Sequence, residues 1–135
     1  MRATRLVAIV DDDPDVRGSL DSLLRSAGLV ARGFASAEDL LDTRDEADFA
    51  CIVTDLHMPG LTGLELQAEL ARRGWTVPLI VVTAYPTRAA RLQALGRGAA
   101  AFLTKPVDPD QLLEAIEPAM DAMAERFPER RASAP

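Results

Sequence analysis

Three aspartates stand where an apolar run of the sequence ends and a polar loop begins. Asp11 and Asp12 directly follow the run at residues 6–10, and Asp55 follows the run at residues 49–54. Continuous apolar runs of this length are typical of parallel strands buried on both faces, and open α/β sheets bind ligands at the carboxyl ends of their strands. If the two strands are neighbours, the three carboxylates converge on one cleft.

Clustered carboxylates repel one another, which restricts what this cleft can do. Two of them ~4 Å apart repel by roughly 4 kcal/mol at an effective dielectric constant of ~20, so the cluster must either keep protons or hold a cation. An all-oxygen, partly hydrated site with few carboxylates suits Mg²⁺, and Mn²⁺ is the alternative. We assign the next acid, Asp13, to a different task, because it can cap a helix whose first residue is Pro14.

Two other polar side chains are predicted at strand ends. Thr83 follows the apolar run at residues 77–82, and Lys105 lies just beyond the short run at residues 99–103. Lys105 is the only lysine of the chain, against fourteen arginines, and a compact ammonium group on a thin stem can reach a phosphoryl oxygen in a narrow cleft. The simpler alternatives are that Thr83 is a turn residue, with Thr104 as a rival hydroxyl, and that Lys105 is an ordinary exposed base.

The single histidine, His57, lies two residues after Asp55. A catalytic general base needs a nucleophile within reach, and no serine or cysteine is placed to partner it. The one cysteine, Cys51, lies inside a predicted buried strand, where a small core side chain is its expected role. We therefore expect the His57 side chain to face solvent.

Strand-like and helical patterns alternate five times along the chain. The expected strands lie at residues 6–10, 29–34, 49–54, 77–82 and 99–103, and the expected helices begin near residues 14, 37, 64, 87 and 109. This alternation predicts a single-domain, doubly wound α/β fold with five parallel strands and helices on both faces. Ser36 and Thr62 are the expected caps of the second and third helices, the latter in a capping box with Glu65. Pro118 lies inside the last helix and is expected to kink it, because proline removes a backbone hydrogen bond there.

Composition narrows the classes of function. The 135 residues carry a net charge of −6, which disfavours direct binding of nucleic acid by this chain. No apolar run approaches the roughly 20 residues of a membrane span, and a single cysteine fits a reducing compartment, so we expect a cytoplasmic protein. The folded domain is expected to cover residues 1–127, and residues 128–135, which lack a core pattern, are expected to form a disordered tail.

Four motifs in order carry a family resemblance. They are Ile-Val-Asp-Asp-Asp at residues 9–13, Thr-Asp-Leu-His-Met-Pro at 54–59, Val-Val-Thr-Ala at 81–84 and Thr-Lys-Pro at 104–106. Each motif alone is weak, but together they resemble the receiver domains of bacterial two-component response regulators over nearly the whole chain. The resemblance implies a flavodoxin-like (βα)5 fold with the strand order 2-1-3-4-5.

The resemblance also implies roles for the acidic cluster. Asp55 would be the phosphoacceptor, taking its phosphoryl group from a sensor histidine kinase, a histidine phosphotransfer protein or a small acyl phosphate. Asp12 and Asp55 would ligate Mg²⁺ through their carboxylates, His57 through its backbone carbonyl, and Asp11 mostly through water. Lys105 and the metal would neutralise the phosphoryl oxygens, which is most of what phosphoryl transfer requires.

A signalling switch is implied by three further residues. Thr83 would hydrogen-bond the attached phosphoryl group, and Phe102 matches the aromatic residue that turns inward as Thr83 moves. The peptide bond between Lys105 and Pro106 would be cis. The new charge would change the surface of the fourth helix, fifth strand and fifth helix, and thereby control a downstream protein that the sequence does not identify.

Among receivers, the chain is closer to those of nitrogen-fixation regulators, whose output domains are helix-turn-helix domains of the LuxR-like type. Residues 96–101 lack the acid that receivers with winged-helix outputs usually carry before the fifth strand. No output domain is expected within the 135 residues, so the chain would be a free-standing regulator or the receiver of a longer transcription regulator. It is expected to be a monomer or a phosphorylation-dependent dimer, with no membrane partner.

Two other classes of function compete with the receiver. An aspartyl-phosphate phosphatase of the dehalogenase type also uses aspartate, threonine, lysine and Mg²⁺, but it needs an acid two residues after the nucleophile, where this chain has His57. A flavodoxin-like nucleotide binder would need a first loop that accepts phosphate, whereas four aspartates between residues 11 and 15 would repel one. We therefore expect a phosphoacceptor that assists its own phosphorylation and dephosphorylation, not an enzyme acting on other substrates.

Overall fold

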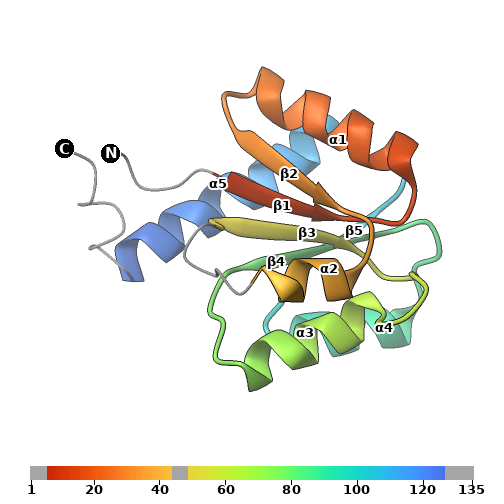
Figure 1. Cartoon of the computed structure of the whole chain (residues 1–135). Coiled ribbons are helices and arrows are strands. Elements are labelled where there is room, and N and C mark those ends of the chain that lie inside the picture. Colours follow the sequence, from red (N-terminus) through yellow and green to blue (C-terminus); the bar gives the residue numbers. More distant parts are fainter. Residues whose placement is uncertain (1–5, 44–48, 127–135) are drawn as a thin grey trace.

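The computed structural model describes residues 6–43 and 49–126, with side chains described as far as residue 122. The expected tail at residues 128–135 and the expected domain end at residue 127 lie outside this part of the chain. Strands and helices alternate through the described residues (Figure 1). They are β1 (Leu6–Val10), α1 (Pro14–Ser26), β2 (Val30–Phe34), α2 (Ala37–Asp42), β3 (Cys51–Asp55), α3 (Gly63–Arg72), β4 (Leu79–Thr83), α4 (Arg88–Gly96), β5 (Ala101–Thr104) and α5 (Pro109–Arg126).

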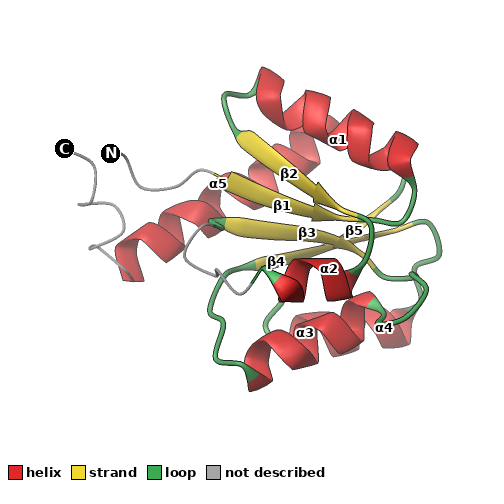
Figure 2. Ribbon diagram, in the orientation of Figure 1, coloured by secondary structure: helices red, strands yellow, loops and turns green. Residues whose placement is uncertain are grey.

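The five strands form one sheet in the order β2-β1-β3-β4-β5, as the resemblance implied. Every neighbouring pair is parallel. Helices α1 and α5 lie on one face of the sheet, and α2, α3 and α4 lie on the other (Figure 2). The predicted doubly wound α/β fold is therefore confirmed, and the carboxyl ends of all five strands lie at a single edge.

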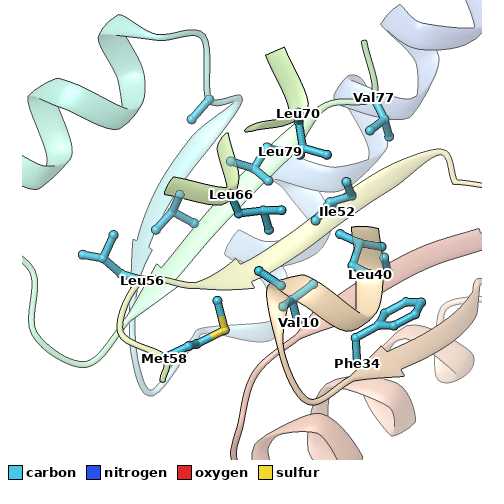
Figure 3. Packing of buried hydrophobic residues seen from close by; sticks show 14 of the residues in the cluster. Val10, Phe34, Leu40, Ile52, Leu56, Met58, Leu66, Leu70, Val77 and Leu79 are labelled. Atoms are coloured by element: carbon cyan, nitrogen blue, oxygen red, sulfur yellow. The ribbon is translucent and has the colours of Figure 1, made fainter. Parts of the chain in front are cut away.

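The core has two parts because alternate residues of each strand face opposite helix layers. On the side of α2, α3 and α4, the fully buried Ile52 belongs to one cluster with Leu40 and Leu66 (Figure 3). Its neighbour Val53 packs on the other side with residues of α1 and α5. Cys51 is fully buried there, as predicted, and burial raises the pKa of its thiol to about 12. This two-sided packing holds the strand ends in fixed register.

Side-chain caps begin the helices that follow the strands, as the sequence predicted. The Asp13 carboxylate accepts a hydrogen bond from the backbone amide of Asp15, at the start of α1. Ser36 caps α2, and Thr62 forms the complete capping box with Glu65 at α3. Because these caps set where each helix starts, they also set the length of the loops that carry the acidic residues.

The structure differs from the predicted boundaries at several strands. β4 begins at Leu79 and not at residue 77, because Pro78 has no amide hydrogen to donate to a neighbouring strand. The Pro78 carbonyl still accepts a hydrogen bond from the Ile52 amide, at 2.9 Å. α5 runs through Pro118 to Arg126, so the proline does not end the helix, and the kink expected there stays a prediction.

Candidate functional site

The three aspartates singled out from the sequence do converge. β1 and β3 are neighbours in the sheet, and their register aligns Val10 with Thr54, so both strands end at the same level. One carboxylate oxygen from each of Asp11, Asp12 and Asp55 lies within 4.8 Å of the other two. Asp11 is buried, Asp55 is partly buried and Asp12 is exposed, so the cluster has a deep side and an open side.

Lys105 reaches this cluster from the end of β5. Its Nζ lies 2.6 Å from Asp11 Oδ2 and 3.3 Å from Asp55 Oδ2. Partial burial by itself lowers the pKa of Lys105, but the hydrogen bond and charge of Asp11, followed by the charge of Asp55, outweigh it and leave the pKa raised. Lys105 is therefore a permanent cation at the site, and the alternative of an ordinary exposed base is wrong.

Backbone amides engage one oxygen of each inner aspartate and leave the other for Lys105. Asp55 Oδ1 accepts from the Leu56 amide at 2.7 Å and from the His57 amide at 3.4 Å. Asp11 Oδ1 accepts from the Asp13 amide at 2.9 Å. In both residues Oδ2 faces the ammonium group. The hydrogen bonds fix each carboxylate in one rotamer, with its second oxygen presented to the cleft.

The donor set fits a small divalent cation. One ammonium group does not balance three carboxylates, so the cluster keeps an excess of negative charge. All the side-chain ligands are oxygens, and their separation of up to 4.8 Å is close to the roughly 4 Å spanned by two opposite ligands of Mg²⁺. Asp11, Asp12 and Asp55 are the residues of this cluster that would hold such an ion, and a ligand role for the carbonyl of His57 stays a prediction.

Of the two candidate hydroxyls, the structure buries that of Thr83. It ends β4 and is fully buried, whereas Thr104 is exposed. Its Oγ1 accepts from the Tyr85 amide at 3.1 Å, which leaves the hydroxyl hydrogen free to be donated. The Thr83 carbonyl accepts from the Lys105 amide at 2.8 Å, so the ends of β4 and β5 are tied together.

Three other predicted residues lie around this edge of the sheet. The peptide bond between Lys105 and Pro106 is cis, as expected. Phe102 is buried in β5 and pairs in register with Val81 of β4. The His57 side chain is exposed and its ring lies edge-to-face with that of Tyr85, 5.9 Å between centroids, so the expectation that it faces solvent is confirmed.

Two supporting contacts were missed by the sequence analysis. Arg17 of α1 donates to the Asp11 carbonyl at 2.6 Å, and its stem crosses Gly33, where a Cβ would lie 3.3 Å from Arg17 Cδ. Gly63 opens α3, and a Cβ there would lie 2.5 Å from the Asp55 carbonyl oxygen. A glycine directly after the capping Thr62 is a signal that the sequence offers for the close contact with Asp55, whereas no sequence pattern indicates the contact of Arg17 with the Asp11 carbonyl.

An open hollow of about 490 Å³ lies beside the cluster, between α1 and the loop after β5. Its lining is mostly apolar and includes Val16, Leu20 and Val107, with Lys105 at the border. None of the helices in the described part of the chain is long and apolar enough to cross a membrane. The hollow thus places a largely apolar surface beside Lys105.

Comparison with known proteins gives a consistent picture. The family model described as response regulator receiver domain matches residues 7–117. The transcriptional regulatory protein FixJ of Azorhizobium caulinodans is 41% identical over 120 residues, which is 89% of this chain and 57% of FixJ. TdiR of Thauera aromatica, also a transcriptional regulatory protein, is 40% identical over 114 residues, 84% of this chain and 50% of TdiR. The chain thus spans about half the length of these curated relatives.

Solved structures match the fold as well. The response regulator StyR superposes with a TM-score of 0.86 at 38% identity, covering 95% of this chain and 65% of StyR. The crystal structure named FixJ-N superposes with a TM-score of 0.78 at 34% identity, covering 90% of this chain and 96% of that one.

Proposed function

Because this chain belongs to the response regulator receiver domain family, we propose that it is a phosphorylation-dependent switch of a two-component system with Asp55 as its phosphoacceptor. One observation carries the proposal. Asp55 Oδ2 is held beside the Lys105 ammonium, 3.3 Å away, within a cluster of carboxylates that suits a divalent cation. A nucleophilic oxygen next to two positive charges is what phosphoryl transfer needs.

The proposed reaction moves one phosphoryl group. Asp55 Oδ2 attacks the phosphorus of a phosphohistidine or acyl phosphate, a new O–P bond forms, and the bond to the donor breaks with its electron pair leaving on the donor. Bound Mg²⁺ would neutralise the oxygens of the transferred group. Lys105 would pair with one of these oxygens, and Thr83, whose Oγ1 accepts from the Tyr85 amide, would donate its hydroxyl hydrogen to another.

The same contacts suggest how the switch is transmitted. When Thr83 turns towards the phosphoryl group, its hydrogen bond with the Tyr85 amide is lost. Phe102, which lies on the neighbouring strand, then repacks, and the surface of α4, β5 and α5 changes. The proposed partners are a sensor histidine kinase or phosphotransfer protein as donor, and a downstream protein that binds the changed surface.

A receiver within a longer transcription regulator is the second candidate. FixJ and TdiR, the relatives named above, are transcriptional regulatory proteins, and the matched segment makes up only 57% of FixJ and 50% of TdiR. In that case the changed surface would act on an attached output domain. The dehalogenase-type phosphatase is disfavoured, because the position two residues after Asp55 holds an exposed histidine and no acid.

Labelling with an acyl phosphate tests the proposal. Wild-type protein incubated with radiolabelled acetyl phosphate and Mg²⁺ is expected to take up one phosphoryl group, and Asp55→Asn none. Asp13→Asn is the matched control, because it removes a charge from the same cluster region while asparagine keeps the helix cap. Equal labelling of Asp55→Asn and wild type would contradict the proposal.

A further inference from the structure

A carboxylate outside the acidic cluster is hydrogen-bonded to the loop between β3 and α3, residues 56–62. Glu38 Oε2, from the first turn of α2, accepts a hydrogen bond from the Leu61 amide at 3.0 Å. The adjacent Gly60 has a φ of +76°, and a Cβ on it would overlap Glu38 Oε2 and lie 3.1 Å from Oε1. The loop backbone therefore lies directly against the Glu38 carboxylate, in space that only glycine leaves free.

This loop carries the one backbone group that would bind the metal. It directly follows Asp55, the last residue of β3, and it includes the exposed residue His57. Leu56 and Met58 anchor its first half in the core, and the Gly63 amide donates to the Leu56 carbonyl at 2.9 Å. The exposed turn at Pro59 and Gly60 lies between these anchors, and Glu38 supplies its polar link to another element.

We propose that Glu38 is a positioning residue for the metal and phosphoryl site. By accepting the hydrogen bond from the Leu61 amide, Glu38 fixes the turn at Pro59 and Gly60. The fixed turn keeps the His57 carbonyl directed at the same metal position as the Asp55 carboxylate. Ser36 contributes indirectly, because its cap sets the start of α2 and so places Glu38 in the first turn. The inference rests on the proposed function and adds that α2 takes part in building the site.

A set of three variants of the whole chain tests this role. Glu38→Ala removes the acceptor, and Glu38→Gln keeps an amide oxygen that can still accept from Leu61. Asp39→Ala is the matched control, since it removes the same charge from the same first turn of α2. Mg²⁺ dissociation constants measured by calorimetry are expected to rise about threefold to tenfold in Glu38→Ala, the range of one net hydrogen bond. Glu38→Gln and Asp39→Ala are expected to stay within about twofold of wild type.

Amide hydrogen exchange gives a readout that is independent of phosphorylation. Exchange at Leu61 is expected to accelerate in Glu38→Ala, with the denaturation midpoint close to that of Asp39→Ala. Equal Mg²⁺ affinities and equal Leu61 exchange in these two variants would overturn the inference, as would a fall in midpoint that alone accounts for the weaker binding. If wild-type protein binds Mg²⁺ and is labelled by acetyl phosphate, either result leaves the proposed function standing. If wild type does neither, both are overturned.

Discussion

The two ends of the β-sheet are built on different principles. At the carboxyl ends of the strands, the buried polar residues Asp11 and Thr83 are each hydrogen-bonded to neighbours on other parts of the site. At the amino ends, a largely apolar groove of about 370 Å³ runs past Trp75. A buried polar residue there is Gln67, whose Oε1 has no hydrogen-bond partner among the residues that the structure describes.

The difference between the two ends shows at which end of the sheet the chain accommodates a buried charge. A buried charge is retained only where it is paired, and Asp11 is paired with Lys105. The amino end needs no charge and is held by packing. Substitutions of core side chains at the amino end should therefore change stability and leave metal binding intact, whereas substitutions of the clustered carboxylates at the carboxyl end should do the reverse.

The largest expected effect is on packing. Ile52→Ala removes a fully buried side chain from the start of β3 and is expected to lower the free energy of unfolding by about 2–5 kcal/mol, because a cavity remains. Urea denaturation measures the loss. The comparison between the two ends is contradicted if the variant has lost its affinity for Mg²⁺ at a urea concentration well below its denaturation midpoint, where it is still folded.

The next effect is a steric clash at the start of α3, where the helix packs directly against the backbone of Asp55. Gly63→Ala places a Cβ 2.5 Å from the Asp55 carbonyl oxygen, and is expected to cost about 1–3 kcal/mol of stability and to weaken Mg²⁺ binding. Gly18→Ala is the control, because nothing lies within 4 Å of its Cβ position inside α1. That control is expected to be neutral or stabilising by up to about 1 kcal/mol. If neither Gly63→Ala nor Gly18→Ala changed the free energy of unfolding or the Mg²⁺ affinity, the close approach between Gly63 and the Asp55 carbonyl would be contradicted.

At the acidic cluster, stability and function should separate. Asp12→Asn relieves repulsion among three carboxylates, so without metal the free energy of unfolding is expected to stay constant or rise by up to about 1 kcal/mol. Its Mg²⁺ affinity is expected to fall about tenfold or more, because a carboxylate ligand is lost. Calorimetry and urea denaturation on the same sample measure both. A destabilised variant with full Mg²⁺ affinity would reverse the comparison.

The smallest effect is expected from the polar residue at the amino end. Gln67→Met removes the unpartnered Oε1, and the Nε2 hydrogen bond to the Ala94 carbonyl. That carbonyl also accepts from the Ala99 amide at 3.0 Å, so it stays satisfied. The free energy of unfolding should change by less than about 1 kcal/mol. A loss above about 2 kcal/mol would show that the amino end depends on this buried polar side chain as well as on apolar packing.

The sequence predicted those parts of the structure that depend on local pattern. The apolar runs predicted the strands, and the polar residues directly after them, such as Asp11 and Asp55, were predicted to meet because parallel strands share one edge. Caps such as Thr62 were predictable because they bond within one turn. The contacts of Arg17 and Glu38 were not, because each depends on how far a flexible side chain reaches across to another element.

Strand starts were predicted less well than strand ends. Apolar residues continue before β3 and β4, so hydrophobic pattern alone does not mark where pairing begins. Pro78, which lacks an amide hydrogen, is the local signal for the later start of β4 at Leu79. Strand ends are marked by a change from apolar to polar residues, and these were the positions that located the site.

The measurement that tests the account most directly is the location of the phosphoryl group after reaction with acetyl phosphate. Tandem mass spectrometry of the wild-type chain should place a single phosphoryl group on Asp55 when Mg²⁺ is present, and none when the metal is chelated. A phosphoryl group on another residue, or equal modification with and without Mg²⁺, would contradict the claim that the metal-binding carboxylates and Lys105 make Asp55 the acceptor.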